Sequence, residues 1–220
     1  MKINNWMLCY AVPEKTAQQS YDFIEHYEII FMAVFVILVI LLVLYIVHEN
    51  YRRDQELMKY AQTDALTGLY NKETTKLRTD EILSTDKDMI HAFLILDMDC
   101  FKQINDGYGH AVGDIVLQKF GQLLRDIFRE DDIVGRIGGD EFVVVMKNIK
   151  MKEMAIAKAE ELLTKTQQYE IKELNGSAIS ISIGIAMAPE DGECYMDLYK
   201  RADQALYQAK RSGKARVCGY

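Results

Sequence analysis

The stretch Arg136-Ile137-Gly138-Gly139-Asp140-Glu141-Phe142 decides the fold of this chain. Residues 132–135 lie upstream of the Gly-Gly-Asp-Glu segment and residues 142–146 lie downstream of it. Both runs are rich in the β-branched and aromatic residues that fit a pleated sheet. Two such runs joined by Gly-Gly predict a tight β-hairpin, because primed two-residue turns need positive φ angles, which glycine adopts freely. The tip then presents Asp140 and Glu141 beside bare backbone, which suits a metal ion and a phosphate, although a solvated turn uses the same residue types.

The composition fits one domain with an accessory segment, since the chain has 220 residues and half of them are hydrophobic. The net charge of -7 argues against nucleic acid as a partner, because binding DNA or RNA depends on Lys and Arg. The same net charge does not argue against a small phosphate-bearing molecule as the ligand. The cysteines form no C-x-x-C pair, so we expect reduced thiols rather than a zinc site or a disulfide framework: Cys9, Cys100, Cys194 and Cys218.

Residues 29–47 form an uninterrupted apolar run without a charged side chain. A helix of that length spans about 28 Å, close to the hydrocarbon thickness of a bilayer, whereas a soluble core helix normally keeps a polar face. Acidic residues precede the run, and Arg52 and Arg53 follow it, so the positive-inside rule places the later residues in the cytoplasm. We therefore expect a single-pass protein of the inner (cytoplasmic) membrane, with its catalytic domain in the cytoplasm.

The segments that flank the apolar run are short. Residues 1–28 are expected to be a short extracytoplasmic segment, too small for a folded sensor domain. Residues 48–63 are rich in helix formers. A heptad seam interrupted at Asp54 predicts either a parallel dimer stalk for signalling or a single solvated helix: Val47, Tyr51, Met58 and Ala61.

The elements expected in residues 64–220 alternate between helices and strands. Their order is a helix capped by Asn71 and ending near residue 83, a buried strand at 91–99, a loop at 101–110, a helix from about 112 to 129, the hairpin, a helix at 151–168, a strand at 178–186, a helix at 195–210 and a short run at 215–218. This is the α+β, ferredoxin-like βαββαβ order with an extra helix and strand. The topology brings the first strand beside the hairpin tip, so Asp97 and Asp140 should face one another.

Five sequence blocks between about residues 62 and 215 resemble the GGDEF family, the diguanylate cyclases. In order they are T-D-A-L-T-G-L-Y-N, D-M-D-C-F-K-Q-I-N-D-G-Y-G-H-A-V-G-D, G-G-D-E-F, S-I-S-I-G-I-A and A-D-Q-A-L-Y-Q-A-K. The resemblance implies condensation of two GTP molecules into cyclic di-GMP with loss of two pyrophosphates. It also implies a fold akin to the polymerase palm and the nucleotide cyclases, and a C2 homodimer in which two GTP molecules meet.

The metal ligands that the resemblance implies lie at the strand end and the hairpin tip. They are Asp97, the main-chain carbonyl of Met98, and Asp140, around Mg²⁺ or Mn²⁺ ions, two for each active site. Glu141 is expected to assist at the metal or to remove the hydroxyl proton, and its role is not separated from that of Asp140. Hard oxygen donors suit these ions.

The implied substrate contacts lie between the first strand and the next helix, and near the end of the chain. Asn105 and Asp114 match guanine-reading positions, and a carboxylate accepts the two donors on the Watson-Crick edge of guanine. Turn, capping and helix-end roles would use the same residue types. The other implied contacts are the substrate-contacting His110, the phosphate-stabilising Lys102, the amides around Cys100 and Phe101, and the phosphate-binding Lys210 and Lys214, the last standing where the family usually has Arg.

An R-x-x-D motif upstream of the hairpin matches the inhibitory site of the family, where product docks on Arg129 and Asp132. The resemblance therefore implies feedback inhibition, while a local i,i+3 ion pair at a helix end is the competing interpretation. For the whole chain, the alternative to a cyclase is a catalytically silent, membrane-tethered receptor of cyclic di-GMP or GTP. A phosphodiesterase is disfavoured because no E-A-L triplet occurs. A structural anchor would not need these acidic motifs.

Overall fold

The structure is a computed structural model that describes residues 14–60, 62–169, 171–174 and 179–220, with the side chains of the first helix described for residues 27–53. The chain divides into two compact units, residues 1–58 and residues 59–220.

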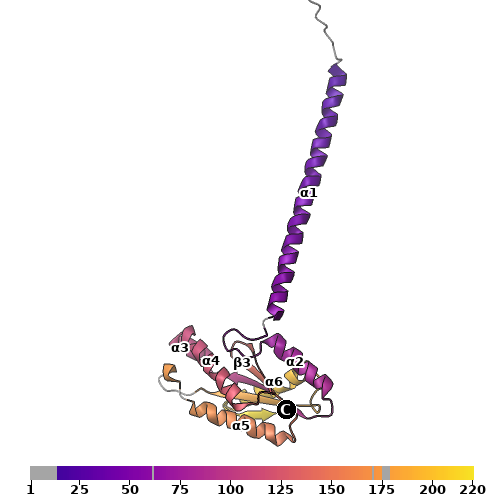
Figure 1. The fold of residues 1–220 in the computed structure, drawn as a ribbon. Helices are drawn as coiled ribbons and strands as arrows, with labels where there is room; N and C mark the ends of the chain where they lie inside the picture. The colour runs from indigo at the N-terminus through magenta and orange to yellow at the C-terminus, as the bar shows by residue number, and fades with distance from the viewer. Residues whose placement is uncertain (1–13, 61, 170, 175–178) are drawn as a thin grey trace, which may run out of the picture. The chain divides into compact units, whose positions relative to one another are not determined.

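The first unit is dominated by one long helix, α1 (Glu14–Tyr60), drawn in indigo and purple in Figure 1. Its segment Tyr27–Arg53 is long and apolar enough to cross a membrane by length and composition. The described side chains of this segment are all exposed, as expected of a helix whose apolar surface faces lipid. The predicted stalk is helical from residue 48 to 60, but the side chains of Asp54 and Met58, and all of Ala61, lie outside the described residues.

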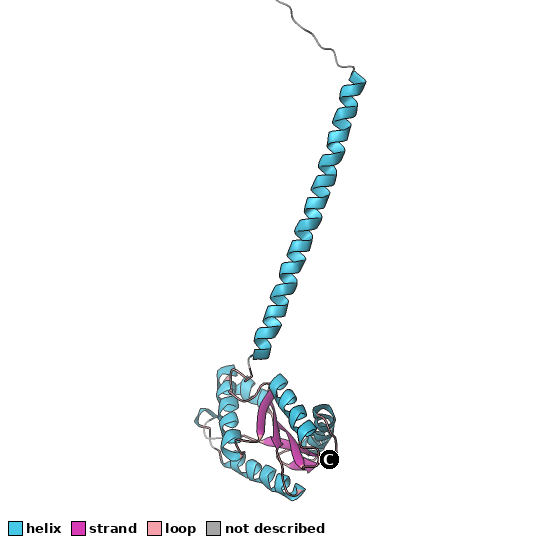
Figure 2. Cartoon of the chain, turned by 45° about the vertical axis from the view of Figure 1, so that its right-hand side comes forward, coloured by secondary structure: helices cyan, strands magenta, loops and turns pink. Residues whose placement is uncertain are grey.

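The second unit is built on a five-stranded sheet in the order β2-β3-β1-β4-β5, drawn in magenta in Figure 2. The central strand β1 pairs antiparallel with β3 and β4, and only β4 and β5 are parallel. The predicted α+β, ferredoxin-like βαββαβ fold is confirmed, with an added helix and short strand at the end. The strands are β1 (His91–Met98), β2 (Ile133–Gly138), β3 (Glu141–Met146), β4 (Ile181–Ala188) and β5 (Val217–Gly219).

Helices cover both faces of the sheet (Figure 1). Leu94 and Leu96 of β1 belong to one core with helices α4 (His110–Ile127) and α5 (Lys152–Gln168). The alternate residues Phe93 and Ile95 belong to a second core with helices α2 (Lys72–Thr85) and α6 (Tyr195–Arg211). Because side chains alternate along a strand, β1 is buried on both sides, as its continuous apolar sequence predicts. A short 3-10 helix, Lys172–Leu174, precedes β4.

Of two local predictions, the cap at Asn71 is confirmed and the loop at 101–110 is wrong. Asn71 caps α2, since its side-chain oxygen accepts a hydrogen bond from the Thr74 amide at 2.9 Å. The predicted loop at 101–110 was wrong, because residues Phe101–Tyr108 form helix α3. Phe101 and Ile104 stand one turn apart and pack into the α4 core, and the break falls at Gly109, whose φ is 86°.

The hairpin is present, but its turn lies one residue later than predicted. Gly138 pairs with Glu141, so the two turn residues are Gly139 and Asp140, and Gly139 takes the positive φ of 33°. The register shifts between Arg136 and Gly138, which marks a bulge. Glu141 is therefore the first residue of β3, and Asp140 sits in the turn itself.

Gly184 in β4 allows α6 to pack closely on the sheet. A Cβ at this position would lie 2.1 Å from the Ala202 carbonyl oxygen and 2.4 Å from the Leu206 amide nitrogen, both in the backbone of α6. Since backbone cannot give way as a flexible side chain does, the glycine sets the distance between helix and sheet.

Gly184→Ala should therefore destabilise the second unit by about 3 kcal/mol, because α6 must shift to admit the methyl group. Thermal or urea unfolding of the full chain in detergent measures this. Gly219→Ala is the matched control, since a Cβ there meets nothing within 4 Å, and its effect should stay within about 0.5 kcal/mol. Equal stability of the two variants would contradict this packing argument.

Candidate active site

The pairing of β1 with β3 places acidic residues side by side at one end of the sheet. Asp97 stands directly opposite Glu141 in the antiparallel register. Both side chains lie on the face that α2 and α6 cover, because Ile95 and Val143, two residues away along each strand, belong to that core. The Met98 amide donates a hydrogen bond to the Asp140 carbonyl oxygen at 3.3 Å. The predicted neighbour of Asp97 was Asp140, and the residue facing it across the strands is Glu141.

These carboxyl groups repel one another. Burial, followed by the charges of Asp140 and Asp99, raises the pKa of Asp97, although Lys210 acts against the rise. The Lys210 Nζ lies 2.7 Å from Asp97 Oδ2 in an ion pair whose Asp97 side chain is 11% exposed. Burial also raises the pKa of Glu141, with the charge of Asp97 as the next cause. When Asp97 and Glu141 are ionised, the single Lys210 ammonium therefore does not fully offset their negative charges.

This donor chemistry fits a divalent cation, since carboxylate oxygens beside a strand end are hard ligands. Within the part of the chain that the structure describes, no group of three His, Cys, Asp or Glu side chains converges closely enough to hold a metal ion. The cation that contacts Asp97 is the Lys210 ammonium. The carboxylates thus suit a divalent cation only if its remaining ligands come from groups other than these side chains.

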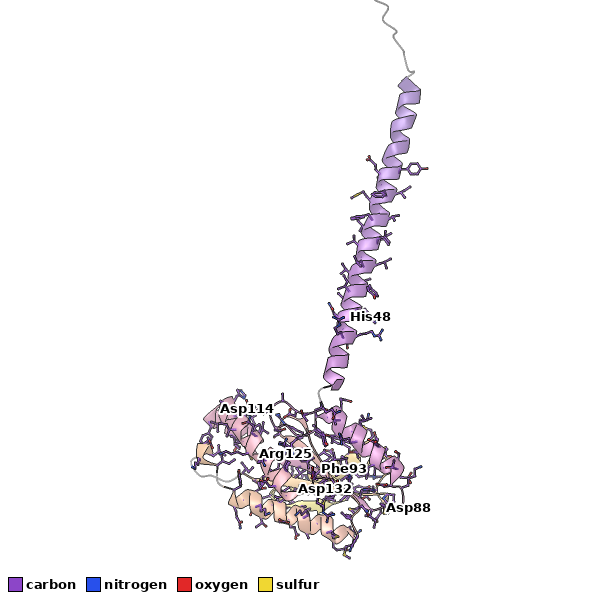
Figure 3. All side chains as sticks on the ribbon, viewed as in Figure 1. His48, Asp88, Phe93, Asp114, Arg125 and Asp132 are labelled. Carbon is purple, nitrogen blue, oxygen red and sulfur yellow. The ribbon has the colours of Figure 1, made fainter. Side chains whose placement is uncertain are left out.

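A second group of predicted residues lies on α3 and α4. Asn105 lies against the first turn of α4, where a Cβ on Gly113 would fall 2.0 Å from its Oδ1. Asp114, which follows Gly113 in α4, is exposed and is labelled in Figure 3. His110, the first residue of α4, is exposed, as is Lys102 on α3. The small Gly113 lets the amide of Asn105 settle beside the turn that carries Asp114.

The start of α3 is the predicted phosphate cradle. Cys100 precedes the helix in the left-handed conformation, with φ of 59° and ψ of 25°. The Lys214 Nζ donates to Cys100 Sγ at 3.2 Å, and this hydrogen bond is the main cause that raises the pKa of Lys214. Lys214 therefore approaches the start of α3 from the turn between α6 and β5.

Sequence reasoning gave no role to Asp99, which is 9% exposed. Its carboxylate accepts hydrogen bonds from Ser180, from Ser182 and from the Ala215 amide. The alternation D-x-D at the end of a buried strand was the available signal. The partners could not be named, because they lie 81 or more positions away.

Sequence reasoning also missed what Arg136 does. Its Nε and Nη2 donate to the Gly139 carbonyl oxygen at 3.0 and 2.8 Å, and its Nη1 lies 3.1 Å from Asp64 Oδ1. Burial raises the pKa of Asp64, but hydrogen bonds from Thr67 and Arg136 outweigh it and leave the pKa below its ordinary value. Arg136 therefore ties the hairpin turn that carries Asp140 to the segment that follows α1.

Arg129 and Asp132 are in contact, but not as a side-chain ion pair. The buried Asp132 accepts hydrogen bonds from the backbone amides of Arg129 and Lys147, both at 3.0 Å. The Arg129 side chain is exposed. A cavity of about 410 Å³ adjoins both residues and is also lined by Tyr70, Arg125 and Phe128. The motif thus fixes a turn and leaves the guanidinium free of Asp132.

The sequence profile described as "Diguanylate cyclase, GGDEF domain" matches residues 61–216. The chain belongs to this family. It is 37% identical over 168 residues to the diguanylate cyclase DgcS of Shewanella oneidensis, covering 75% of this chain and 55% of that protein. It is 36% identical over 168 residues to the response regulator PleD of Caulobacter vibrioides, covering 74% of this chain and 37% of that protein.

Solved GGDEF domains share the fold. The domain of TpbB, or YfiN, from Pseudomonas aeruginosa superposes with a TM-score of 0.67 at 35% identity, covering 71% of this chain and 93% of that one. DgcB from Caulobacter crescentus, in complex with c-di-GMP, gives a TM-score of 0.67 at 25% identity over 79% of this chain and 93% of that one. The chain spans only 23%, 55% and 24% of three of its curated relatives.

The raised pKa of Glu141 gives a pH dependence with a definite sign. The folded state holds the proton above the ordinary value of 4.5, so the associated stability is present below that pH and is lost as pH rises through the folded pKa. Without metal, Glu141→Gln should therefore be more stable than the wild type at pH 7, and the difference should shrink below pH 4.5.

Thermal unfolding of the full chain in detergent with EDTA measures this difference. Glu193→Gln is the control, since Glu193 is exposed and should change little at either pH. A Glu141→Gln variant no more stable than the wild type at pH 7 would show that the carboxyl cluster is not strained.

Proposed function

We propose that this chain is a diguanylate cyclase, which condenses two GTP molecules into cyclic di-GMP and two pyrophosphates. The observation that carries the proposal is the acidic cluster of Asp97, Asp140 and Glu141, next to Lys210 at one end of a GGDEF fold. Relatives that align with most of this domain are named as diguanylate cyclases.

The reaction is attack of a ribose 3′-oxygen on an α-phosphate, which needs alignment, removal of the hydroxyl proton and neutralised charge. Asp97, the Met98 carbonyl and Asp140 would hold two Mg²⁺ or Mn²⁺ ions. When bound, these ions neutralise phosphate charge and make the hydroxyl more acidic. The carboxylate of Asp140 or Glu141 receives the hydroxyl proton. Lys210 leaves Asp97 for the terminal phosphates when GTP arrives.

The guanine would lie between α3 and α4. Asp114 accepts from the N1 and N2 donors of guanine, which adenine does not present in the same pattern, and Asn105 contacts the same base. His110 contacts the substrate nearby. The amides of Cys100 and Phe101 bind the β- and γ-phosphates, with Lys102 and Lys214 supplying positive charge.

The complete catalyst would be a C2 homodimer in a membrane, because each subunit binds one GTP and two must meet head to tail. Residues 29–47 would cross the inner membrane once, after a short extracytoplasmic segment at 1–28. Residues 48–63 would form the signalling and dimerisation helix, and residues 64–220 the cytoplasmic catalytic domain. Confinement to a membrane raises the local concentration of subunits and favours pairing.

Mass detection of cyclic di-GMP, made by the full chain in membranes from GTP and Mg²⁺, tests this function. Asp140→Ala should abolish the product, since it removes a metal-binding carboxylate. Asp88→Ala is the matched control, an exposed aspartate before the other end of β1 that should keep full activity (Figure 3). GTP binding without any product from the wild type would instead favour a silent receptor of GTP or cyclic di-GMP.

We also propose that cyclic di-GMP inhibits the enzyme by docking on Arg129 and Asp132. The exposed Arg129 guanidinium can read guanine O6 and N7, while the buried Asp132 shapes the turn beside the cavity of about 410 Å³.

Arg129→Ala should raise the cyclic di-GMP concentration needed for half inhibition by at least about tenfold, the loss of one good bidentate contact. Initial rates of pyrophosphate release with added product measure this. Lys150→Ala serves as the control, since Lys150 is an exposed cation that does not line this cavity. Unchanged sensitivity in Arg129→Ala would rule out this docking site.

A further inference from the structure

We propose that Asp99 is a positioning residue that holds Lys214 in the phosphate-binding part of the active site. This inference rests on the proposed function, in which Lys214 contacts the terminal phosphates of GTP.

Asp99 joins three segments through one carboxylate. Its Oδ1 accepts from Ser182 Oγ at 2.8 Å, and its Oδ2 accepts from Ser180 Oγ at 2.6 Å and from the Ala215 amide at 3.1 Å. The two serines belong to β4 and the residue before it. Ala215 lies 116 positions from Asp99, in the turn between α6 and β5.

A buried carboxylate costs free energy unless hydrogen bonds satisfy it. Asp99 is 9% exposed, and the donors named above are all uncharged. Joining β1 to β4 does not require an acid, because their backbones already pair along eight register positions. Pairing between β1 and β4 does not reach Ala215, whose amide is bonded by the Asp99 carboxylate. We therefore attribute the acidic side chain at this position to the turn rather than to the sheet.

That turn has a backbone that needs anchoring. Lys214 and Ala215 have φ values of 62° and 47°, the left-handed region that residues with a Cβ adopt at a cost. Such a conformation persists where neighbouring contacts determine it. The Lys214 amide bonds the Ala209 carbonyl at 3.1 Å, and the Ala215 amide bonds Asp99, so the turn is held from both sides.

The anchored turn aims Lys214 at the start of α3. Its Nζ lies 3.2 Å from Cys100 Sγ, beside the amides proposed to bind phosphate. A lysine has a flexible stem and a point charge, and it lacks the two-pronged geometry of arginine. The position of its backbone therefore largely decides where the charge lies, and Asp99 fixes that position.

The test is Asp99→Asn in the full chain in detergent, with binding of GTP and of GMP measured by calorimetry. The amide group keeps the size of the side chain but removes the negative charge and one of the two acceptor oxygens. The side chain then no longer accepts all three hydrogen bonds, and the anchor of the turn is weakened. GTP should bind roughly tenfold more weakly, the size of one lost charge-assisted contact. GMP, which lacks the β- and γ-phosphates, should bind as before.

A double-mutant cycle with Lys214→Met separates positioning from general structure. If Asp99 acts through Lys214, the double variant should bind GTP as weakly as Lys214→Met alone. The Mg²⁺ concentration for half-maximal GTP binding should stay that of the wild type. The proposal would be overturned if the losses of GTP affinity in the two single variants added up in the double variant, or if Asp99→Asn weakened GTP and GMP binding equally. A raised Mg²⁺ requirement would also overturn it, because Asp99 would then be a metal ligand.

Ser180→Ala keeps the test decisive if Asp99→Asn does not fold. It removes one donor to Oδ2 and should weaken GTP binding in the same direction, and again only when Lys214 is present. No change in GTP binding would overturn the proposal. Because the readout is binding, a chain that binds GTP through Asp99 and Lys214 but makes no cyclic di-GMP would refute the cyclase and retain this inference.

Discussion

The antiparallel register that sets Asp97 opposite Glu141 is the constraint on which the rest of the site depends. It places the buried Asp97 beside the partly buried Glu141 at one strand end, where burial raises the pKa of both. The fold accepts this cost because Lys210 reaches Asp97 from α6. That reach depends in turn on Gly184, which lets the helix backbone lie close to the sheet. Packing, charge and the proposed chemistry are therefore coupled at one end of β1.

The surrounding contacts hold this arrangement from three directions. Arg136 fixes the turn that carries Asp140 and links it to Asp64, within the same unit. Asp99 secures the turn that carries Lys214. Asn105 rests on Gly113 beside Asp114. A proposed metal and nucleotide would thus meet groups whose backbones are already placed, and the principal rearrangement left is the transfer of Lys210 from Asp97 to phosphate.

The sequence predicted the sheet, the hairpin and the cap at Asn71, because each depends on local patterns of apolar residues and turn formers. It misjudged α3, since Gly107 and Gly109 suggested a loop while the helical spacing of Phe101 and Ile104 was overlooked. The turn was placed one residue early because the bulge before Gly138 is not encoded in turn propensity. Asp99 and Arg136 gained their roles only in three dimensions, through partners up to 116 and 72 positions away.

The central claim is that the carboxylate end of β1 and β3 binds a metal together with GTP. Electron paramagnetic resonance of Mn²⁺ with the full chain in detergent, with and without GTP, tests it most directly. We expect weak Mn²⁺ binding without nucleotide, because Lys210 occupies Asp97, and much tighter binding with GTP, which Asp97→Asn should abolish. Protein-bound Mn²⁺-GTP of equal affinity in the wild type and Asp97→Asn would contradict it.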